Sequence, residues 1–568
     1  MEIEQEPRRS KYDLCIIGSG PAGIILALEY ARANPAKQVL LVEYGSNKQA
    51  RENGLDNSIE IKNKLNHHDP YDCTNKGLGG TSATWGGRCV MYDGIDFIDR
   101  PILNGGYTWP PGMLAELQPF LQQAAAYFEC GRPVFDLEEL PGIAAGPIAE
   151  NFTKNDIVSD TLLERWSMPT RFGKRYEKEM DAQDNLHLLQ GYEARDFTAP
   201  DAQGKVSALY VRATDETGEL IVIKAAQFVL AAGAQESTRI LLRNTKLFSK
   251  LGFVPPALGR YYQGHLSGKI ASVRFKGAPH KTDYGFLHDT DGTYVRRRFQ
   301  FAAPFLAANN LLNTAIWLDN PLYYNPAHRS GAMSFMYLAM LVPILGKKLA
   351  PPAIAHSITS GKKTSIGRHL VNVLRGLPGS LITPASIFFR RYCLKRKLPG
   401  VFLYSPQNQY ALHFHAEQVP DAGNRMELSD DGKTLQINYG LTKADIDSVI
   451  QLHQVLDQQL RAMGCGELEY WFPPEALPDA IRHMSKDGIH QSGTTRIADA
   501  PDKGVVDAHL KLWGTSNIYV CSSSVFPTSG QANPTFLLGA FAARLAAHFG
   551  HPPAINPAPL EKDASIAI

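Results

Sequence analysis

The chain has 568 residues, of which 44% are hydrophobic and 20% charged, with a formal net charge of +2, and these values are ordinary for a globular protein of two or more domains. No stretch reaches the roughly 18 apolar residues that a membrane-spanning helix needs, and the seven cysteines include no Cys-x-x-Cys pair, so we expect no membrane span, disulfide framework or metal site. No recognised nucleic-acid module accompanies the charges, so no nucleic-acid partner is expected.

The first predicted unit is a strand, a glycine-rich turn and a helix. The apolar run 12–17 predicts a buried strand, the turn is Gly18-Ser19-Gly20-Pro21-Ala22-Gly23, and the helix covers 24–32. Such a helix directs its N-terminal amides at a pyrophosphate. A second apolar strand, 38–42, ends at Glu43, whose carboxylate can accept hydrogen bonds from ribose hydroxyls. This unit predicts a dinucleotide site and leaves both NAD and FAD open.

The middle of the chain adds another glycine-rich loop and several strands. Residues 77–88 contain five glycines around Trp85, so that the backbone can lie close to a flat ligand with the indole as its wall. Apolar and alternating patterns predict strands over 185–194, 206–213 and 220–223, followed by a strand that runs into a small-residue turn and a helix over 229–239.

A basic and apolar segment follows. From 320 to 416 there is no Asp or Glu, and the apolar run 333–345 comes directly before Lys347 and Lys348; the other cations are Arg329, Lys362, Lys363, Arg368, Arg375, Arg390, Arg391, Lys395, Arg396 and Lys397. An apolar face bordered by basic residues is how a protein lies on an anionic bilayer. Residues 333–397 therefore predict peripheral contact with an anionic membrane, and a helix with a solvated basic loop is the alternative.

The next elements predict an antiparallel sheet with helices on one face. Strands are expected over 409–415, 425–428 and 434–439, and apolar residues at helical spacing predict a helix over 442–463. His413 and His415 alternate along the first of these strands. They line a substrate pocket or are half-buried sheet residues, and the pattern leaves both open.

The C-terminal part carries the last motifs. His490 opens the segment 490–496, a strand is expected over 517–520, and the segment 526–535 contains Asn533, followed by a predicted helix over 535–548. Taken in order with the loops at 18–23, 77–88 and 229–239, this set resembles the glucose-methanol-choline (GMC) flavoprotein oxidoreductases. The ending 521–528 looks most like the branch of pyranose oxidases and membrane sugar dehydrogenases.

The resemblance implies the fold class. We expect an α/β protein in which a Rossmann-like FAD-binding domain is interleaved with an α+β substrate domain built on an antiparallel sheet. The FAD-binding domain is predicted from 1–98, 185–265 and 486–552, the substrate domain from 99–184 and 266–485, and a tail from 553–568.

The resemblance also implies the cofactor and its contacts. We expect FAD, held by Gly18, Gly20, Gly23, Glu43, Gly80, Thr81, Thr84, Trp85, Glu193, Ala194, Ala232, Gly233, Ser522, Asn533, Pro534 and Thr535. Many alcohol-oxidising members have Asp where this chain has Ser522. In pyranose oxidases a His before the Trp of the second motif tethers the flavin, and this chain has Thr84 there, so we predict non-covalent FAD.

The predicted catalytic residues are His490 and Asn533. Alcohol oxidation removes a hydroxyl proton and a carbon-bound hydride, which suits an imidazole base beside flavin N5. His490 matches the family's catalytic His, and Asn533 matches the partner that hydrogen-bonds the substrate oxygen; an ordinary helix cap is the alternative for Asn533. His265 lies in a segment that resembles one beside the flavin domain, and we interpret it as structural or supporting.

The sequence therefore predicts an FAD-dependent oxidoreductase that oxidises a CH–OH group of a sugar or glycoside. The alternatives are an oxidoreductase for an apolar or lipid-linked alcohol and a flavin-binding protein without turnover. Oxygen, a quinone or a separate redox protein is the expected electron acceptor. The segment 12–17 cannot be cleaved as an export signal without destroying the cofactor site, so a cytoplasmic location is expected, peripheral on the inner membrane face if the basic segment binds lipid.

Overall fold

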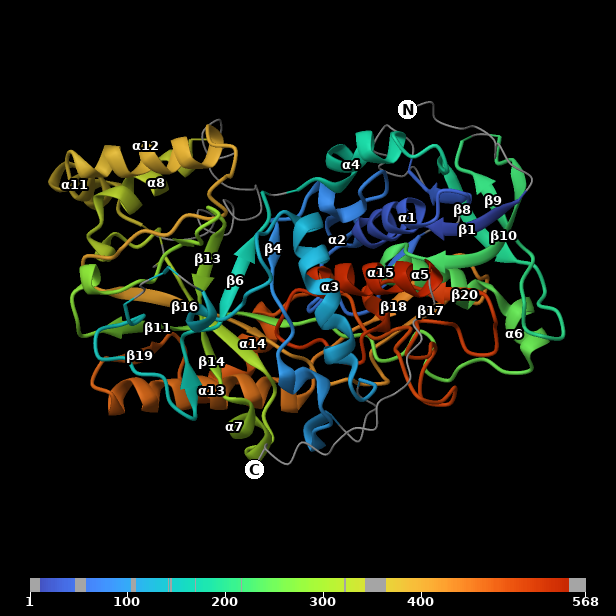
Figure 1. Ribbon diagram of the computed structural model, residues 1–568. Coiled ribbons are helices and arrows are strands. Elements are labelled where there is room, and N and C mark those ends of the chain that lie inside the picture. Colours follow the sequence, from blue (N-terminus) through green and yellow to red (C-terminus); the bar gives the residue numbers. More distant parts are fainter. Residues whose placement is uncertain are drawn as a thin grey trace.

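The computed structural model describes residues 11–550 except 46–57, 104–108, 141, 144–145, 169, 216, 321–322 and 343–363. The predicted tail and the cations Lys347, Lys348, Lys362 and Lys363 lie outside the described residues. Figure 1 shows two groups of sheets and helices side by side, with the first sheet on the right and the second on the left. The expected α/β class with two interleaved sheet systems is confirmed.

The first sheet has seven strands from three separate parts of the chain. Its order is β7-β2-β1-β10-β9-β8, and β20 pairs with β10; the bounds are β1 Tyr12–Ile17, β2 Val39–Glu43, β7 Leu186–Gln190, β8 Tyr192–Phe197, β9 Ala208–Ala213, β10 Leu220–Leu230 and β20 Ile518–Val520. The pairs among β7, β2, β1, β10 and β20 are parallel. The carboxyl ends of these strands meet at one edge, where ligands bind in open parallel sheets.

Three predicted strands in this sheet had the wrong extent. The expected strand 185–194 is divided into β7 and β8 at Gly191, whose φ of 81° turns the chain from one side of the sheet to the other. The expected strands 220–223 and 229–230 are one strand, because β10 first pairs antiparallel with β9 and then parallel with β1.

Helices cover this sheet and form its core. Helix α1 (Pro21–Ala33) packs on α15 (Thr535–Gly550), and α15 packs on α3 (Met113–Phe128). Side chains of α3 and α4 (Phe172–Asp181) belong to the same apolar core as the first sheet. These two helices lie within 99–184, which we predicted as substrate domain; their apolar faces are buried against the first sheet system instead.

The second sheet is antiparallel and has six strands. Its order is β19-β11-β16-β15-β14-β5; the bounds are β5 Val158–Ser159, β11 Leu266–Phe275, β14 Phe299–Phe301, β15 Thr314–Asp319, β16 Gln409–Ala416 and β19 Gly466–Tyr470. Helix α13 (Lys443–Ala462) buries its apolar side chains with Tyr410, Leu412 and Phe414 of β16. This confirms the predicted antiparallel sheet with a helix on one face for the expected strand 409–415, and places His413 and His415 on the opposite face. The expected strands 425–428 and 434–439 pair with each other but lie in a separate sheet with residues 59–61, so their assignment to this sheet was wrong.

Smaller elements complete the described structure. A four-stranded sheet has the order β12-β13-β6-β4 and a three-stranded sheet the order β17-β18-β3. The remaining bounds are β3 Ile59–Ile61, β4 Arg88–Cys89, β6 Leu163–Trp166, β12 Leu287–His288, β13 Tyr294–Arg297, β17 Arg425–Leu428, β18 Leu435–Asn438, α2 Pro70–Cys73, α5 Gly233–Arg243, α6 Thr245–Leu251, α7 Ala303–Ala308, α8 Gly331–Leu341, α11 Ile366–Arg375, α12 Gly379–Tyr392 and α14 Leu477–Met484.

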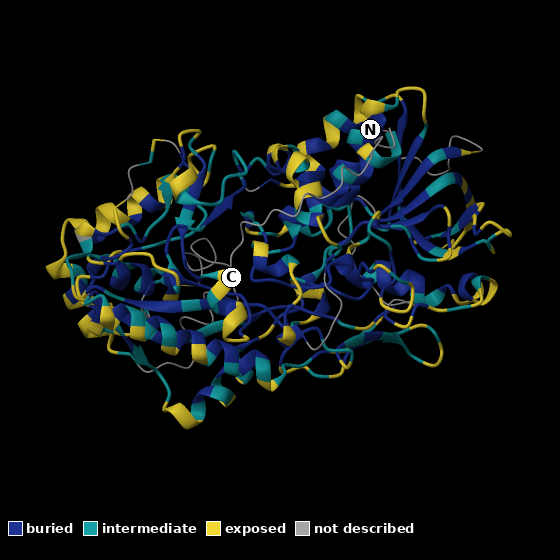
Figure 2. Cartoon of the chain, turned by 60° about the horizontal axis from the view of Figure 1, so that its bottom comes forward, coloured by how far each residue is buried: buried dark blue, intermediate teal, exposed yellow. Residues whose placement is uncertain are grey.

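Helices α8, α11 and α12 form a separate layer at the end of the molecule that lies away from the first sheet (Figure 1). The predicted apolar run 333–345 begins in α8, but Met333, Met336, Tyr337 and Met340 are buried, because α11 and α12 pack on this helix. Figure 2 shows buried strands inside and exposed residues along the outer helices. Among the described residues, no helix is both long enough and apolar enough to cross a bilayer.

Candidate active site

The glycine turn after β1 has the geometry of a phosphate-binding loop. Gly18 has a φ of 103°, and a Cβ there would lie 2.6 Å from the carbonyl oxygen of Ala231. A Cβ on Gly23 would lie 2.0 Å from the carbonyl oxygen of Gly18, so Gly23 lets α1 approach the strand closely. By contrast, a Cβ on Gly20 would meet no atom within 4 Å. The space beside Gly20 is therefore open for a ligand at the start of α1.

Glu43 is buried at the end of β2 and fastens this loop. Its Oε2 accepts from the Ser19 backbone N–H at 3.0 Å and from the Ser19 hydroxyl at 2.6 Å. Its Oε1 accepts from the N–H groups of Gly45 and Gly77 at 2.9 and 2.8 Å. The carboxylate thus joins three loops, and a ribose hydroxyl, the partner we expected, would share it with these protein donors.

The second glycine-rich loop faces the first one. Gly80 lies next to Gly20, since a Cβ on Gly80 would be 3.1 Å from the Gly20 Cα. Trp85 packs on Phe128 with 5.7 Å between ring centroids and donates from Nε1 to the Thr170 carbonyl at 2.8 Å. Because a ring contact and a hydrogen bond both fix the indole, Trp85 forms a rigid wall of the site.

Glu193 is anchored by arginines at the far end of the site. Its carboxylate binds Arg195, Arg212 and Arg243 at 3.1, 3.0 and 2.8 Å. Burial alone would raise the pKa of Glu193, but the combined hydrogen bonds and charges of Arg243, Arg195 and Arg212 lower that pKa. Glu193 is therefore ionised and positioned.

A cavity of about 460 Å³ joins these elements. Of the sixteen residues predicted to bind the cofactor, all line it except Gly23, which packs inside α1, and Pro534, which precedes α15. It is also lined by residues that we did not predict, among them Tyr44, Cys73, Lys76, Arg88, Gln235 and Arg243. An extended cavity with an open glycine loop at a helix start fits a dinucleotide.

The predicted catalytic pair meets in the lining of this cavity. The amide Nδ2 of Asn533 lies 2.7 Å from Nε2 of His490, although the two residues are far apart in sequence. Both line the cavity. Within the described structure, Oδ1 of Asn533 is buried without a hydrogen-bond partner, so it is available to a ligand.

Asp487 holds the His490 segment in place. Its buried carboxylate accepts from the N–H groups of Gly488, Ile489 and His490 at 2.7, 2.8 and 3.0 Å, and it lies 3.8 Å from Nδ1 of His490. Burial alone would raise its pKa, but the hydrogen bond with His265 and the nearby His490 hold the pKa well below the usual range. Sequence reasoning missed Asp487, and its only signal was its position three residues before His490.

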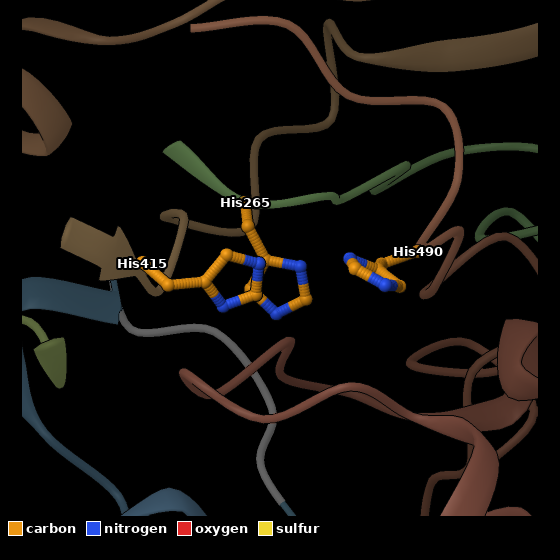
Figure 3. Close-up of side chains that lie close together, drawn as sticks. All are labelled: His265, His415 and His490. Carbon is orange, nitrogen blue, oxygen red and sulfur yellow. The ribbon is translucent and has the colours of Figure 1, made fainter. Parts of the chain in front are cut away.

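Two further histidines stand beside His490 (Figure 3). His265 and His415 are stacked with 4.1 Å between ring centroids, and each presents its ring nearly perpendicular to His490. One ligand nitrogen of each ring lies within 4.8 Å of the others, a grouping that can hold a metal ion. However, Nδ1 of His415 is 2.7 Å from the Gln531 carbonyl and Nδ1 of His265 is 3.3 Å from Oδ2 of Asp487, so we interpret the cluster as a hydrogen-bonding one.

Neither of the two histidines on β16 lines the cavity. His413 stacks on Trp317 at 4.5 Å and its Nε2 is 2.8 Å from the Ser267 hydroxyl. His415 is buried beside the catalytic pair. The two residues therefore differ: His413 is a packed sheet residue, and His415 contacts His490 without lining the cavity.

Comparisons with known proteins agree with this geometry. A family model described as GMC oxidoreductase matches residues 420–542. The chain is 22% identical to 6'''-hydroxyparomomycin C oxidase of Streptomyces lividus, over 94% of this chain and 90% of that protein. Pyridoxine 4-oxidase from Mesorbium loti has a similar fold, with a TM-score of 0.51, 16% identity and coverage of 95% of this chain and 99% of that one. A fungal aryl-alcohol oxidase gives a TM-score of 0.50, 15% identity and the same coverage.

Proposed function

The chain belongs to the GMC oxidoreductases, an FAD-dependent family of enzymes acting on CH–OH donors, and on this premise we propose that it oxidises a hydroxyl of a sugar or glycoside to a carbonyl with His490 as the base. The observation that carries the proposal is the contact between His490 and Asn533 in the lining of the cofactor cavity. Such a pair offers a proton acceptor and an oxygen ligand at one point.

In this mechanism His490 Nε2 takes the hydroxyl proton of the substrate. The imidazole is oriented from behind, because Asp487 faces its Nδ1 and binds the backbone N–H of the same residue. Asn533 donates from its neutral amide to the substrate oxygen as negative charge develops there, without competing for the proton. When bound, FAD supplies the acceptor for the carbon-bound hydride.

The start of α15 is positioned to stabilise negative charge on a reduced cofactor. Thr535 and Leu538, in the first turn of this helix, line the cavity just after Asn533. The N-terminal end of a helix carries partial positive charge, which stabilises a neighbouring anion. We therefore propose that this end faces the part of the cofactor that becomes negative on reduction.

The pH dependence follows from the burial of His490. Burial lowers the pKa of His490 to about 4, against the opposing effect of the Asp487 carboxylate. The neutral imidazole is the active base, so kcat/KM should stay constant from neutral pH downward and fall only as the pH passes through about 4. A pH profile of kcat/KM measures this. Replacing Asp487 by Asn should move the decline to lower pH, and a decline centred near the ordinary histidine value of about 6.5 would contradict the assignment.

The sugar class rests on two observations. The relative from Streptomyces lividus is named as an oxidase of hydroxyparomomycin C, an aminoglycoside. The segment 521–528 also resembles the sugar-oxidising branch, and this chain has Ser522 where many alcohol-oxidising members have Asp. Ser522 is buried, lines the cavity and hydrogen-bonds Ser524 at 2.5 Å, so a neutral hydroxyl replaces that acid.

The test is anaerobic reduction of the purified holoenzyme by a panel of free sugars, glycosides, sugar nucleotides and long-chain alcohols, followed at the flavin absorption band. Bleaching by a sugar or glycoside supports the proposal. Readmission of air then distinguishes the acceptors, since rapid return of colour means oxygen and slow return means a quinone or a redox protein. Bleaching by no sugar-type compound would overturn the sugar class.

A second candidate is an apolar or lipid-linked alcohol. It is favoured by the exposed apolar side chains of α11 and α12, which lie at the end of the molecule that holds the second sheet (Figure 1). In the same panel, this candidate requires that only long-chain alcohols bleach the flavin. If neither group of compounds does so in a protein with bound FAD, the third possibility, a flavin-binding protein without turnover, replaces both.

We propose that FAD is held without a covalent bond. Thr84, at the position of the tethering His in pyranose oxidases, accepts a hydrogen bond from Asn75 Nδ2 at 2.5 Å and is a poor nucleophile. Two thiols line the cavity, but burial raises the pKa of both Cys73 and Cys521 to about 12, which keeps them protonated and unreactive. Acid precipitation should release all flavin into the supernatant. Yellow colour in the pellet, with a flavinyl peptide after digestion, would show the opposite.

We also propose a reducing compartment, the cytoplasm. All seven cysteines are free thiols, and six of them are buried. Free thiols without disulfides are usual in proteins that stay in a reducing compartment. Fractionation of the native host, with the protein detected by antibody, tests this location.

A further inference from the structure

Helix α11 has its polar side inside and its apolar side outside. His369 and Asn372 are buried, whereas Ile366, Leu370 and Leu374 are 53%, 50% and 67% exposed. In a surface helix of a globular protein the apolar stripe faces the core. This helix is therefore reversed with respect to the rest of the chain.

The buried polar side of α11 is fully used. His369 Nδ1 lies 3.0 Å from the Ser334 hydroxyl and its Nε2 lies 3.1 Å from the Tyr324 carbonyl. Asn372 donates to the Pro326 carbonyl at 2.9 Å and to the Ser334 hydroxyl at 3.1 Å. These bonds determine which side of the helix faces α8, so the apolar side must face outward.

Helix α12 continues the apolar surface. Ile382, Phe388, Phe389 and Tyr392 are 62%, 47%, 55% and 41% exposed. With 3.6 residues per turn these positions share one side of the helix. Together, the exposed apolar residues of the two helices and their connection form what we call the apolar helix face: Ile366, Leu370, Val371, Leu374, Leu377, Leu381, Ile382, Phe388, Phe389 and Tyr392. This face holds nearly half of the exposed large hydrophobic residues in the described chain.

The charged residues of the two helices and their flanking segments are all cations. Arg368, Arg375, Lys395 and Lys397 are exposed in or beside the two helices, and no Asp or Glu occurs anywhere from 320 to 416. A second copy of this chain packed face to face would bring like charges together, which is unfavourable. An anionic bilayer instead accepts both the apolar side chains and the cations.

We propose that the apolar helix face docks on an anionic membrane surface, with α11 and α12 lying in the interface. The bordering cations would reach the lipid headgroups while their aliphatic stems cover apolar surface. The prediction of membrane contact by 333–397 is thus kept, but its contact residues are those of α11 and α12, not the buried α8.

The docking helices are connected to the cavity through packed aromatic and arginine side chains. Ile387 of α12 packs in one apolar cluster with Trp166, and Arg296 lies over the Trp166 ring. Arg296 and Arg88 both lie over the Trp317 ring, and Arg88 lines the cavity. A continuous series of packed side chains therefore connects the docking helices to the active site.

The test is co-sedimentation of the holoenzyme with vesicles of phosphatidylcholine alone or mixed with phosphatidylglycerol, at low and high salt. We expect binding to the anionic vesicles that weakens as salt rises. The double variant Leu374→Glu/Ile382→Glu should bind at least about tenfold more weakly, because it places charge in the apolar surface. The control Leu220→Glu/Val254→Glu changes side chains that are 57% and 56% exposed elsewhere, and should bind like the wild type.

All four positions are exposed, so flavin content and thermal stability should be unchanged in both variants, which excludes a folding defect. Oxidation of a soluble substrate should also be unchanged, so this test is independent of the proposed reaction. The proposal is overturned if the wild type ignores anionic vesicles or if Leu374→Glu/Ile382→Glu binds them equally well. A dimer that this variant converts to a monomer, without vesicle binding, would make the face a protein interface instead.

Discussion

Replacing His490 by Ala is expected to lower the rate of flavin reduction by substrate roughly a hundred- to ten-thousand-fold while FAD stays bound. Without the imidazole, the hydroxyl proton has no acceptor at the point where Asn533 holds the oxygen. Anaerobic stopped-flow measurement of flavin bleaching reads this step directly. The fall should appear in the limiting rate rather than only in the substrate concentration needed for half saturation.

His413→Ala is the matched control, because this histidine lies on β16, stacks on Trp317 and does not line the cavity. It should keep nearly the full rate of flavin reduction. A His490→Ala protein that bleaches as fast as the wild type would refute the assignment of the base. Equal losses in both variants would point to a structural effect instead.

The second large effect is expected at Gly20. The Gly20→Val protein should fold normally but bind FAD at least about tenfold more weakly, because the second glycine of such loops lets the backbone approach the pyrophosphate. The residue has a φ of −68° and ψ of −178°, which valine adopts without strain, and its Cβ would meet no protein atom within 4 Å. Titration of the apoprotein with FAD, followed by fluorescence quenching, measures the change.

Two other glycines separate cofactor binding from folding. Gly94 also has open space around its Cβ position but lies outside the cavity, so Gly94→Val should bind FAD normally. Gly23→Ala should destabilise the fold itself, since its Cβ would lie 2.0 Å from the Gly18 carbonyl oxygen. Wild-type affinity in Gly20→Val would mean that the phosphates lie elsewhere.

Much of the fold follows from local pattern. The strand 12–17 and the helices starting near 24, 442 and 535 are predicted within a few residues, because their apolar spacing and caps are local properties. Errors occur where the extent of a strand depends on which neighbouring strand it pairs with. Gly191 divides one apolar run between two strands, and β10 is a single strand because it pairs first with β9 and then with β1.

The candidate site also combines residues that motifs identify with residues that only the fold brings together. His490, Asn533 and the glycine loops are identified by motifs, and all but two of the predicted cofactor residues line one cavity. Asp487, His265 and His415 are not identified as a group, because nothing in the spacing of 265, 415 and 487 brings them together. Only the antiparallel pairing of β11, which begins just after His265, with β16 and the position of the 487–490 segment beside them create these contacts.

The apolar segment shows the limit of sequence reasoning most clearly. By itself, the sequence determined the family and an acid-free basic region with apolar runs, and predicted the FAD-binding residues and the pair His490 and Asn533, because glycine turns, motifs, apolar periodicity and charge are properties of neighbouring residues. Tertiary structure alone decided that α8 is covered and that α11 turns its apolar side outward. The physical reason is that burial depends on which surface packs against a helix, and here the buried hydrogen bonds of His369 and Asn372 orient α11.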